Sequence, residues 1–227
     1  MKIGIIGAME VEMNLIIDEI ENVETISIMS STYYQGFIDD VEVVLVKSGI
    51  GKVNASIAAT VLIREFGCNY IINTGIAGAT KPLCHRDIII SESVSYNDFD
   101  LRFFGYPFGQ VPELPIEFVP SIDSKVMIKS ILNKLNIKYK EAKIYSGDMF
   151  VTSMDQLSNI KNNEGIVLEM EGAGIAHTCV KGGVDFIIIR YISDVVGEKS
   201  QEEYFKFEED MAKMSAEILI KVIKNLE

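Results

Sequence analysis

Four carboxylates that follow short apolar runs are the strongest candidates for chemistry in this sequence, namely Glu12, Glu169, Glu171 and Asp194. A carboxylate beside a buried strand costs free energy unless it is paired or used in the function. If the apolar runs are strands, these side chains lie near carboxyl ends of strands, where an open α/β sheet keeps its ligand crevice. The sequence therefore points to acid–base chemistry by carboxylates.

Each acid also has a purely structural interpretation. Glu12 and Glu171 can be explained as first-turn acids favoured by a helix dipole, and Asp194 as a cap after its strand. Taken singly, these explanations are the simpler ones. Acids at the corresponding ends of three successive apolar runs favour a joint site instead.

Other kinds of site find little support. The two histidines, His85 and His177, lie neither in HExxH nor beside paired cysteines, so no metal site is expected. No GxSxG occurs that would frame a nucleophilic serine. The glycine-rich segments 48–52 and 74–78 follow apolar runs, and their N–H groups could hold an anion, although tight strand-to-helix turns explain them equally well. Neither matches GxGxxG or GxxxxGK[ST], which leaves no case for NAD or ATP.

Strands and helices are expected to alternate along the chain. Short β-branched runs predict strands at residues 3–6, 41–46, 70–72, 87–90 and 186–189. Helical spacing predicts helices at residues 10–20, 53–66, 125–135, 172–180 and 202–226. The alternation predicts an α/β fold with a central sheet and helices on both faces. Because no repeat or low-complexity linker divides the chain, we expect residues 1–227 to form a single domain.

Composition excludes several classes of protein. The 227 residues carry 21 Lys and Arg against 33 Asp and Glu, a net charge of −12, which excludes a nucleic-acid binder with a basic face. No apolar run reaches the roughly 18 residues that span a bilayer, and the N-terminus lacks the features of a secretory signal. We therefore expect a soluble protein. Cys68, Cys84 and Cys179 are odd in number and lack CxxC spacing, which suggests reduced thiols and a cytoplasmic location.

Residues 98–120 are expected to form a long, ordered loop, because four of the five prolines lie there among aromatic residues and glycines. Such an apolar loop must either fold back on its own core or meet another subunit. We favour the subunit contact, because apolar loop patches of this size commonly mark interfaces.

Six blocks of the sequence together resemble one known family. They are MKIGIIGAMEVEM, KSGIGKVNA, IINTGIAGA, SGDMF, LEMEGAGIAH and RYISD, and they run in this order from residue 1 to about residue 194. The resemblance is to the 5′-methylthioadenosine/S-adenosylhomocysteine nucleosidases of the nucleoside phosphorylase superfamily. It implies a homodimeric, three-layer α/β/α enzyme with a central mixed β-sheet. Such an enzyme hydrolyses the N-glycosidic bond of thio-substituted adenosines to adenine and a thioribose, without metal or cofactor.

The resemblance also assigns catalytic roles. Cleavage passes through an oxocarbenium-like sugar, so the site needs an acid for the leaving base and a base for water. By similarity, Asp194 is the acid that protonates adenine N7, and Ser193 holds its carboxyl group. Glu12 is the general base for the attacking water, which Arg190 helps to position.

By the same similarity, the remaining matched residues bind the substrate. Glu171 accepts hydrogen bonds from the ribose hydroxyls, and Met170 packs on the sugar. Phe150 stacks on the purine, and the backbone of Val151 reads the purine edge.

The family closes its 5′-thio pocket with an apolar segment from the partner subunit. Leu101, Phe104 and Pro112 match that segment, and Tyr204 and Phe207 match the lid near the start of the last helix. The resemblance thus supports the subunit contact expected for residues 98–120.

One residue departs from the family pattern. Position 76 is Ile, where the family usually carries a serine whose hydroxyl helps to fix water and ribose. Because an alkyl group cannot form hydrogen bonds, we expect weaker water positioning, slower turnover or a shifted substrate preference. Ile76 also argues against the phosphorylase relatives, because it removes polar surface where their phosphate sits.

Two other functions stay open at this point. A nucleosidase for another purine nucleoside, such as aminodeoxyfutalosine, would use the same acids and differ in the 5′ pocket. The apolar Leu101, Phe104 and Tyr204 favour a thioether there. A non-catalytic purine-nucleoside binder is the other alternative, which the intact acids disfavour and Ile76 keeps open.

Overall fold

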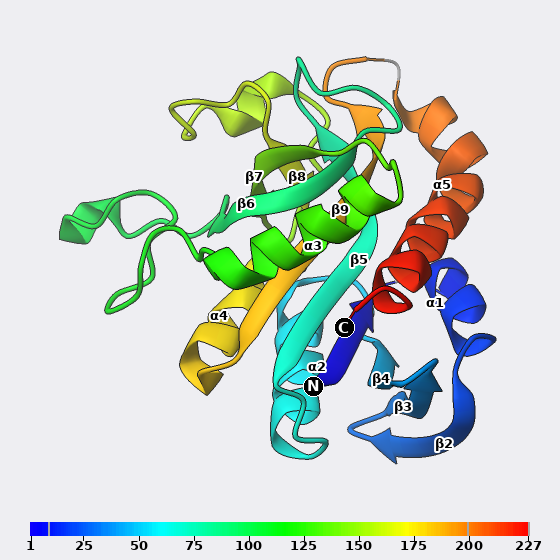
Figure 1. Ribbon diagram of the computed structural model, residues 1–227. Coiled ribbons are helices and arrows are strands. Elements are labelled where there is room, and N and C mark those ends of the chain that lie inside the picture. Colours follow the sequence, from blue (N-terminus) through cyan, green and yellow to red (C-terminus); the bar gives the residue numbers. More distant parts are fainter. Residues whose placement is uncertain (9, 199, 227) are drawn as a thin grey trace.

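A mixed β-sheet runs through the middle of the structure (Figure 1). The computed structural model describes residues 1–8, 10–198 and 200–226, and of residues 11 and 200–209 the backbone alone. Within these residues nine strands form one sheet in the order β2-β3-β4-β1-β5-β8-β7-β6-β9. The strands are β1 (Lys2–Gly7), β2 (Glu21–Ile28), β3 (Ser31–Ile38), β4 (Val41–Lys47), β5 (Tyr70–Ala79), β6 (Ile88–Tyr96), β7 (Lys140–Ser146), β8 (Val167–Glu169) and β9 (Asp185–Val195).

Strand β5 joins the two halves of the sheet. It runs parallel to β1 on one side and to β9 on the other, and its last residues pair antiparallel with β8. Because β9 also pairs with β6, the strands β5, β8, β7, β6 and β9 close into a ring. The carboxyl ends of β1, β5 and β9 are thereby brought together, as the placement of the acids requires.

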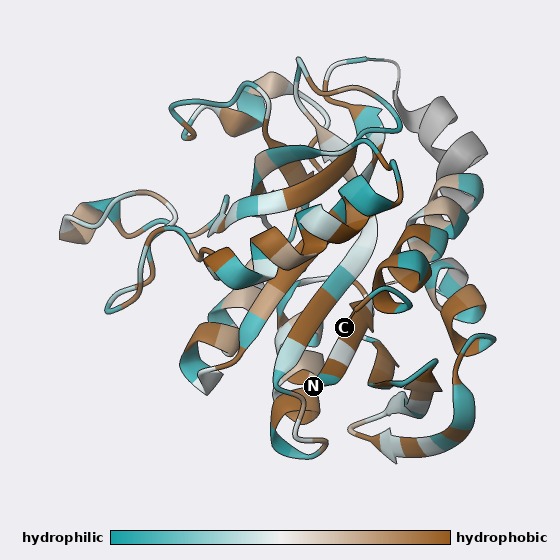
Figure 2. Cartoon of the chain, viewed as in Figure 1, coloured by the Kyte–Doolittle hydropathy of each residue, from teal (hydrophilic) through white to brown (hydrophobic). Residues whose placement is uncertain are grey.

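Helices cover both faces of the sheet. They are α1 (Glu10–Ile17), α2 (Lys52–Arg64), α3 (Ile122–Lys134), α4 (Gly172–Gly182) and α5 (Ser200–Ile223), with short 3₁₀ helices η1 (Arg102–Phe104) and η2 (Met154–Leu157). Small residues of α2 and α4, such as Ala58 and Ala173, enter one core, whereas apolar residues of α1, α3 and α5, such as Ile16, Ile128 and Leu219, enter the other. Hydrophobic residues concentrate along the central strands between them (Figure 2). The expected three-layer α/β/α architecture is confirmed.

The predicted elements are all present, but the prediction missed four strands. β2 is largely exposed and β3 half-buried, so neither reads as an apolar run. β7 alternates charged with buried residues, and β8 has three residues. The interpretation of residues 74–78 as a turn is wrong, because this segment continues β5. Asn73 and Thr74 can stay in a buried strand because their side chains bond to the Ile6 carbonyl and to Ser215.

Residues 98–120 form the predicted loop, and they divide into two parts. Phe118 is buried, bridges to Val94 of β6 and stacks on His177, and Phe99 packs against the core. The tip instead projects from the body, with Phe103 92% and Phe104 70% exposed (Figure 1). One part of the loop therefore packs on its own core, while the tip presents aromatic surface to the outside.

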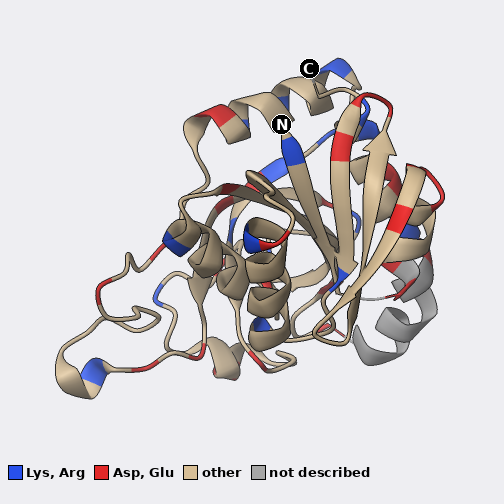
Figure 3. Ribbon diagram, turned by 90° about the horizontal axis from the view of Figure 1, so that it is seen from below, with Lys and Arg blue, Asp and Glu red and all other residues tan. Residues whose placement is uncertain are grey.

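The distribution of charged residues and the length and hydropathy of the helices bear on which classes of protein remain. Lys and Arg are dispersed among Asp and Glu over many elements (Figure 3). Among the helices of the described residues, none is long and apolar enough to cross a membrane.

Candidate active site

A cleft opens beside the carboxyl ends of β1, β5 and β9. It brings together eight of the predicted site residues: Glu12, Ile76, Phe150, Met170, Glu171, Arg190, Ser193 and Asp194. Parts of the chain as far apart as residues 8 and 194 meet there. The acids that follow separate apolar runs in the sequence thus line one cleft.

Glu12 lies in the cleft near the start of α1, shortly after the end of β1. Its carboxylate is almost fully buried in the first turn of α1, where the helix dipole stabilises a negative charge. Oε2 accepts a hydrogen bond from the Ala8 N–H at 2.9 Å, and Oε1 accepts one from the Ile76 N–H at 3.3 Å. Two backbone donors, one directly after β1 and one in β5, thus fix the orientation of this carboxylate.

Asp194 is placed by an irregularity of β9. The register against β5 shifts between Ala77 and Gly78, so that Ile192 pairs with Ala77 and Asp194 with Gly78. Ser193 is the extra residue, and such a bulge turns the following side chain. The Ser193 hydroxyl donates to Oδ1 of Asp194 at 2.7 Å. Burial raises the pKa of Asp194, although the bond from Ser193 opposes this shift.

Glycines in β5 make room for these acids. A methyl group on Gly78 would lie 3.0 Å from Oδ2 of Asp194. On Gly75 it would lie 2.8 Å from Oε1 of Glu12 and 3.1 Å from Nη1 of Arg190. The segment that resembled an anion-binding turn instead lets two carboxylates and a guanidinium pack against a strand.

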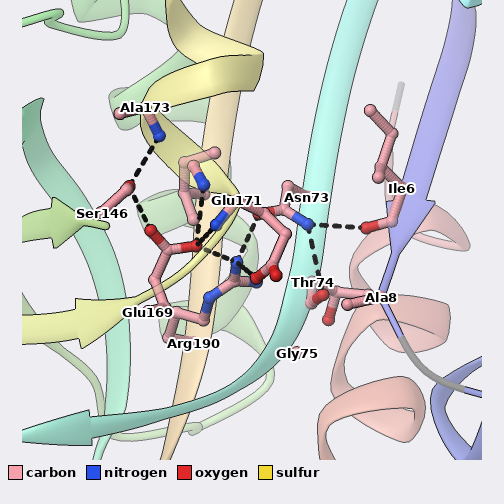
Figure 4. A network of polar contacts seen from close by, with 12 residues as sticks. Ile6, Ala8, Asn73, Thr74, Gly75, Ser146, Glu169, Glu171, Ala173 and Arg190 are labelled. Atoms are coloured by element: carbon pink, nitrogen blue, oxygen red, sulfur yellow. Dashed lines mark hydrogen bonds and ion pairs between the residues drawn. The ribbon is translucent and has the colours of Figure 1, made fainter. Parts of the chain in front are cut away.

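Arg190 and Glu171 line the same cleft as Glu12, and Figure 4 shows Arg190 between Glu169, Glu171 and Asn73. Arg190 is 1% exposed, and its Nη2 donates to Asn73 Oδ1 and Glu169 Oε2, both at 2.6 Å. Burial alone would lower its pKa, but Glu169 and Glu171 outweigh this effect and raise it. Its Nε and Nη1 are buried and donate to no group among the described residues.

Glu171 lies between β8 and α4. Its Oε1 accepts a hydrogen bond from the Gly51 N–H at 3.0 Å, and its Oε2 lies 3.6 Å from Nη2 of Arg190. Burial, followed by the charge of Glu169, raises the pKa of Glu171 to about 7. This carboxyl group therefore changes its charge near neutral pH.

The other predicted residues stand outside the cleft wall. Val151 is buried in a small apolar cluster with Leu168, next to Phe150. Leu101, Phe104 and Pro112 lie in the projecting loop and do not line the cleft of their own chain; their predicted place is in the cleft of a partner subunit. The predicted lid residues Tyr204 and Phe207 have side chains outside the described residues.

The structure adds residues to which the sequence analysis gave no role, although it had named Glu169 as a candidate. Glu169 and Thr74 line the cleft, and Asn73 holds Arg190 from behind. The signal for Asn73 and Thr74 was present, because polar residues that continue an apolar strand need partners in the core. The cleft wall is completed by Ala8, Ile50, Ala77 and Leu168, which carry no such signal.

The histidines have structural surroundings. Nδ1 of His177 lies 2.8 Å from the Tyr96 hydroxyl, and its ring stacks on Phe118. His85 lies 3.9 Å from Glu198. Over the part of the chain that the structure describes, no group of three or more His, Cys, Asp or Glu residues is arranged to hold a metal ion.

Comparison with known proteins agrees with this site. Residues 2–225 match the family model of the phosphorylase superfamily. A 5′-methylthioadenosine/S-adenosylhomocysteine nucleosidase from Staphylococcus haemolyticus is 40% identical over 227 residues, which cover 99% of this chain and 100% of the relative.

Solved structures extend the likeness to three dimensions. The nucleosidase of the same name from Colwellia psychrerythraea, solved in complex with adenine, has a TM-score of 0.93 at 36% identity and covers 100% of this chain and 96% of its own. A futalosine hydrolase mutant from Helicobacter pylori has a TM-score of 0.93 at 31% identity, with 99% of each chain covered. The chain therefore belongs to the phosphorylase superfamily and, within it, to the family of 5′-methylthioadenosine/S-adenosylhomocysteine nucleosidases.

Proposed function

We propose that this protein hydrolyses the N-glycosidic bond of 5′-methylthioadenosine and S-adenosylhomocysteine, releasing adenine and the corresponding thioribose. The observation that carries the proposal is the pair of buried carboxyl groups, Asp194 and Glu12, that face one cleft from opposite neighbours of β5. Relatives of the same length and fold bear this activity in their names.

Asp194 is the proposed acid. Adenine leaves easily only when N7 is protonated, which requires a carboxyl group that still holds its proton near neutral pH. Burial raises the pKa of Asp194 and so favours its protonated form, the form that this role requires. Ser193 keeps the carboxyl group oriented by donating to Oδ1 and so leaves Oδ2 to carry the proton.

Glu12 is the proposed base. Water that attacks the sugar must lose a proton as the glycosidic bond breaks. Oε1 of Glu12 and Nη1 of Arg190 face the same side of Gly75, so a water molecule between them could donate to the carboxylate and accept from the guanidinium. The arrangement activates water without a metal.

The remaining wall residues fit the two halves of a nucleoside. Glu171 and Met170 line the cleft, and we expect Glu171 to accept hydrogen bonds from the ribose hydroxyls and Met170 to pack on the sugar. Phe150, which is partly exposed at the cleft, offers a face on which adenine stacks. The backbone of Val151, the next residue, is expected to read the purine edge.

Adenine release is the test of this proposal. Purified protein would be given methylthioadenosine, S-adenosylhomocysteine and adenosine, each with and without phosphate. Release from the two thio-substrates at equal rates with and without phosphate is the expected result. A requirement for phosphate would reassign the protein as a phosphorylase.

The likeness to a futalosine hydrolase keeps a second substrate class in view. The same assay with aminodeoxyfutalosine distinguishes a nucleosidase whose 5′ pocket takes a different group. Binding of all these nucleosides without adenine release would instead identify a non-catalytic binder.

Ile76→Ser is expected to raise kcat for methylthioadenosine by no more than about tenfold, because a single added hydrogen bond contributes about 0.5–1.5 kcal/mol. The effect is small because the bond from position 76 to Glu12 comes from the backbone N–H, which the substitution keeps. Ile76 also packs against the core on the α5 side, so the melting temperature should fall. Steady-state kinetics and thermal unfolding check both effects. A lower kcat would show that the alkyl side chain itself assists the reaction.

The proposal includes a homodimer, a single domain over residues 1–227 and a cytoplasmic location without cofactor. The aromatic tip of the loop supports the dimer, since Phe103 and Phe104 are too exposed to stabilise their own chain. The free thiols of Cys68, Cys84 and Cys179 fit a reducing compartment.

Replacing both Phe103 and Phe104 by Asp should weaken the dimer and raise KM for methylthioadenosine, because the loop is expected to complete the partner's 5′ pocket. Sedimentation analysis and kinetics measure the two effects. Val126→Asp, at an exposed position of α3, is the matched control and should change neither. A dimer that withstands the double substitution would place the contact elsewhere.

A further inference from the structure

Glu169 is a buried carboxylate that the reaction itself does not use. It ends β8, and four protein groups donate to it (Figure 4). The Ser146 hydroxyl donates to Oε1, while Oε2 accepts from the N–H groups of Glu171 at 3.0 Å and Gly172 at 2.7 Å, and from Nη2 of Arg190 at 2.6 Å. Because its acceptor capacity is directed at the protein, Glu169 is not placed as the group that acts on a substrate.

Two of these bonds fix the start of α4. The first N–H groups of a helix have no partner within the helix, and the Glu171 side chain does not cap α4. Glu169 accepts from the N–H groups of Glu171, which directly precedes α4, and of Gly172, the first residue of α4. Ser146 accepts from the next, the Ala173 N–H, at 2.7 Å. Glu169 and Ser146 thus satisfy three consecutive backbone donors. They thereby fix the position of the Glu171 backbone, from which its side chain extends.

The other strong bond fixes Arg190. Nη2 is held between Glu169 and Asn73, and Asn73 is itself anchored to the Ile6 carbonyl at 2.8 Å. With Nη2 held from behind, Nη1 lies beside Gly75 on the side of Glu12. The direction of the guanidinium therefore depends on Glu169.

We propose that Glu169 is a positioning residue of the hydrolysis, which holds Arg190 and the backbone of Glu171 so that both side chains face the sugar. This inference rests on the proposed function. It gives one buried carboxylate a role distinct from those of the acid, the base and the ribose acceptor.

The charge of Glu169 has a second consequence for Glu171. Four groups face the Glu171 carboxyl: Glu169 from β8, Arg190 from β9, Glu12 from α1 and the Gly51 N–H ahead of α2. Glu169 and Glu12 raise the pKa of Glu171, whereas Arg190 and the Gly51 bond lower it. Removing the charge of Glu169 should therefore let Glu171 ionise at lower pH, and the acid limb of kcat/KM should move to lower pH with it.

Two substitutions separate geometry from charge. Glu169→Gln keeps an acceptor for the three donors at Oε2 but removes the charge, whereas Glu169→Asp keeps the charge but shortens the side chain. Both should lower kcat by about 10- to 100-fold, because displaced positioning groups cost rate in this range. Only Glu169→Gln should move the acid limb. Glu141→Gln, which removes an exposed carboxylate of β7 paired with Lys129, is the control and should leave kcat and the pH profile unchanged.

Several outcomes would overturn the inference. One is a folded Glu169→Gln variant with wild-type kcat and pH profile. Another is a Glu169→Gln variant that loses kcat while its acid limb stays in place, which is the behaviour of a purely structural residue. If Glu169→Gln does not fold, Ser146→Ala serves instead, and an unchanged kcat in that variant would count against the proposal.

The failure of the proposed function is recognisable separately. A wild-type protein that releases no adenine contradicts the hydrolysis. In that case the affinity for methylthioadenosine is measured by calorimetry at a series of pH values. The loss of affinity at acid pH should then occur at lower pH in Glu169→Gln than in the wild type. An active wild type with an unaffected Glu169→Gln variant contradicts the positioning role alone.

Discussion

Asp194→Asn is expected to lower kcat for methylthioadenosine by about 10²–10⁴-fold, the range that general acid catalysis contributes. An amide of the same shape can still accept the bond from the Ser193 hydroxyl, so the local geometry should survive. It cannot transfer a proton to adenine N7. Single-turnover kinetics with purified variant protein measure the effect, and nucleoside binding should persist in calorimetry.

The pH dependence of activity tests the same role of Asp194. Burial raises the pKa of Asp194, and the acid works only while it is protonated, so wild-type activity should fall as pH rises through that pKa. The variant should lose this basic limb. Ser193→Ala is the informative companion: it removes the bond that opposes the raised pKa, so its basic limb should move to higher pH.

Asp194→Asn should not destabilise the fold. A carboxyl group whose pKa is raised by folding binds its proton more tightly in the native state, so its contribution to stability falls as pH rises from the unfolded to the folded pKa. Removing the buried ionisable group therefore removes an unfavourable contribution above that range. We expect a melting temperature at pH 8 that is equal to or higher than that of the wild type. A large loss of stability together with activity would indicate that Asp194 acts in the fold instead.

The acids could be found from the sequence because the cost of burying charge is a local property. Glu12 and Asp194 each follow an apolar run within a few residues, and carboxyl ends of neighbouring strands meet at one edge of the sheet. Sequence spacing alone therefore predicted that they would share a cleft. The long amphipathic helices and inner strands were equally readable, because their apolar periodicity reflects burial on a fixed face.

What could not be predicted depends on partners that are distant in sequence. The strand β5 was read as ending before Asn73, because the bonds that compensate its polar residues come from Ile6 and from Ser215 of α5. Gly75 and Gly78 read as turn residues, since nothing near them in sequence shows that Glu12 and Asp194 would press against them. The bulge at Ser193, which aims Asp194, likewise depends on the pairing of β9 with β5.

Glu12→Gln is the second substitution expected to abolish turnover, again by about 10²–10⁴-fold in kcat. Both carboxylate oxygens accept backbone N–H bonds, from Ala8 and from Ile76. A glutamine can satisfy only one of them, and its NH₂ group would face the other donor. The variant therefore loses both the base and part of its orientation. Glu10→Gln is the matched control, because Glu10 lies in the same helical turn but is exposed and paired with Lys47, and it should retain wild-type kcat.

A substrate that needs no acid separates the two catalytic carboxyl groups. With a 5-methylthioriboside whose leaving group departs without protonation, such as 4-nitrophenolate, Asp194→Asn should recover much of the wild-type rate, because the missing step is no longer required. Glu12→Gln should stay inactive with the same compound, since water must still be deprotonated. Release of nitrophenolate is followed by absorbance for both variants. Recovery by Glu12→Gln would reverse the assignment of base and acid. The cleft contains both carboxyl groups, and their environments distinguish them. Asp194 is a buried carboxyl group whose pKa is raised, whereas Glu12 is a carboxylate held by two N–H donors.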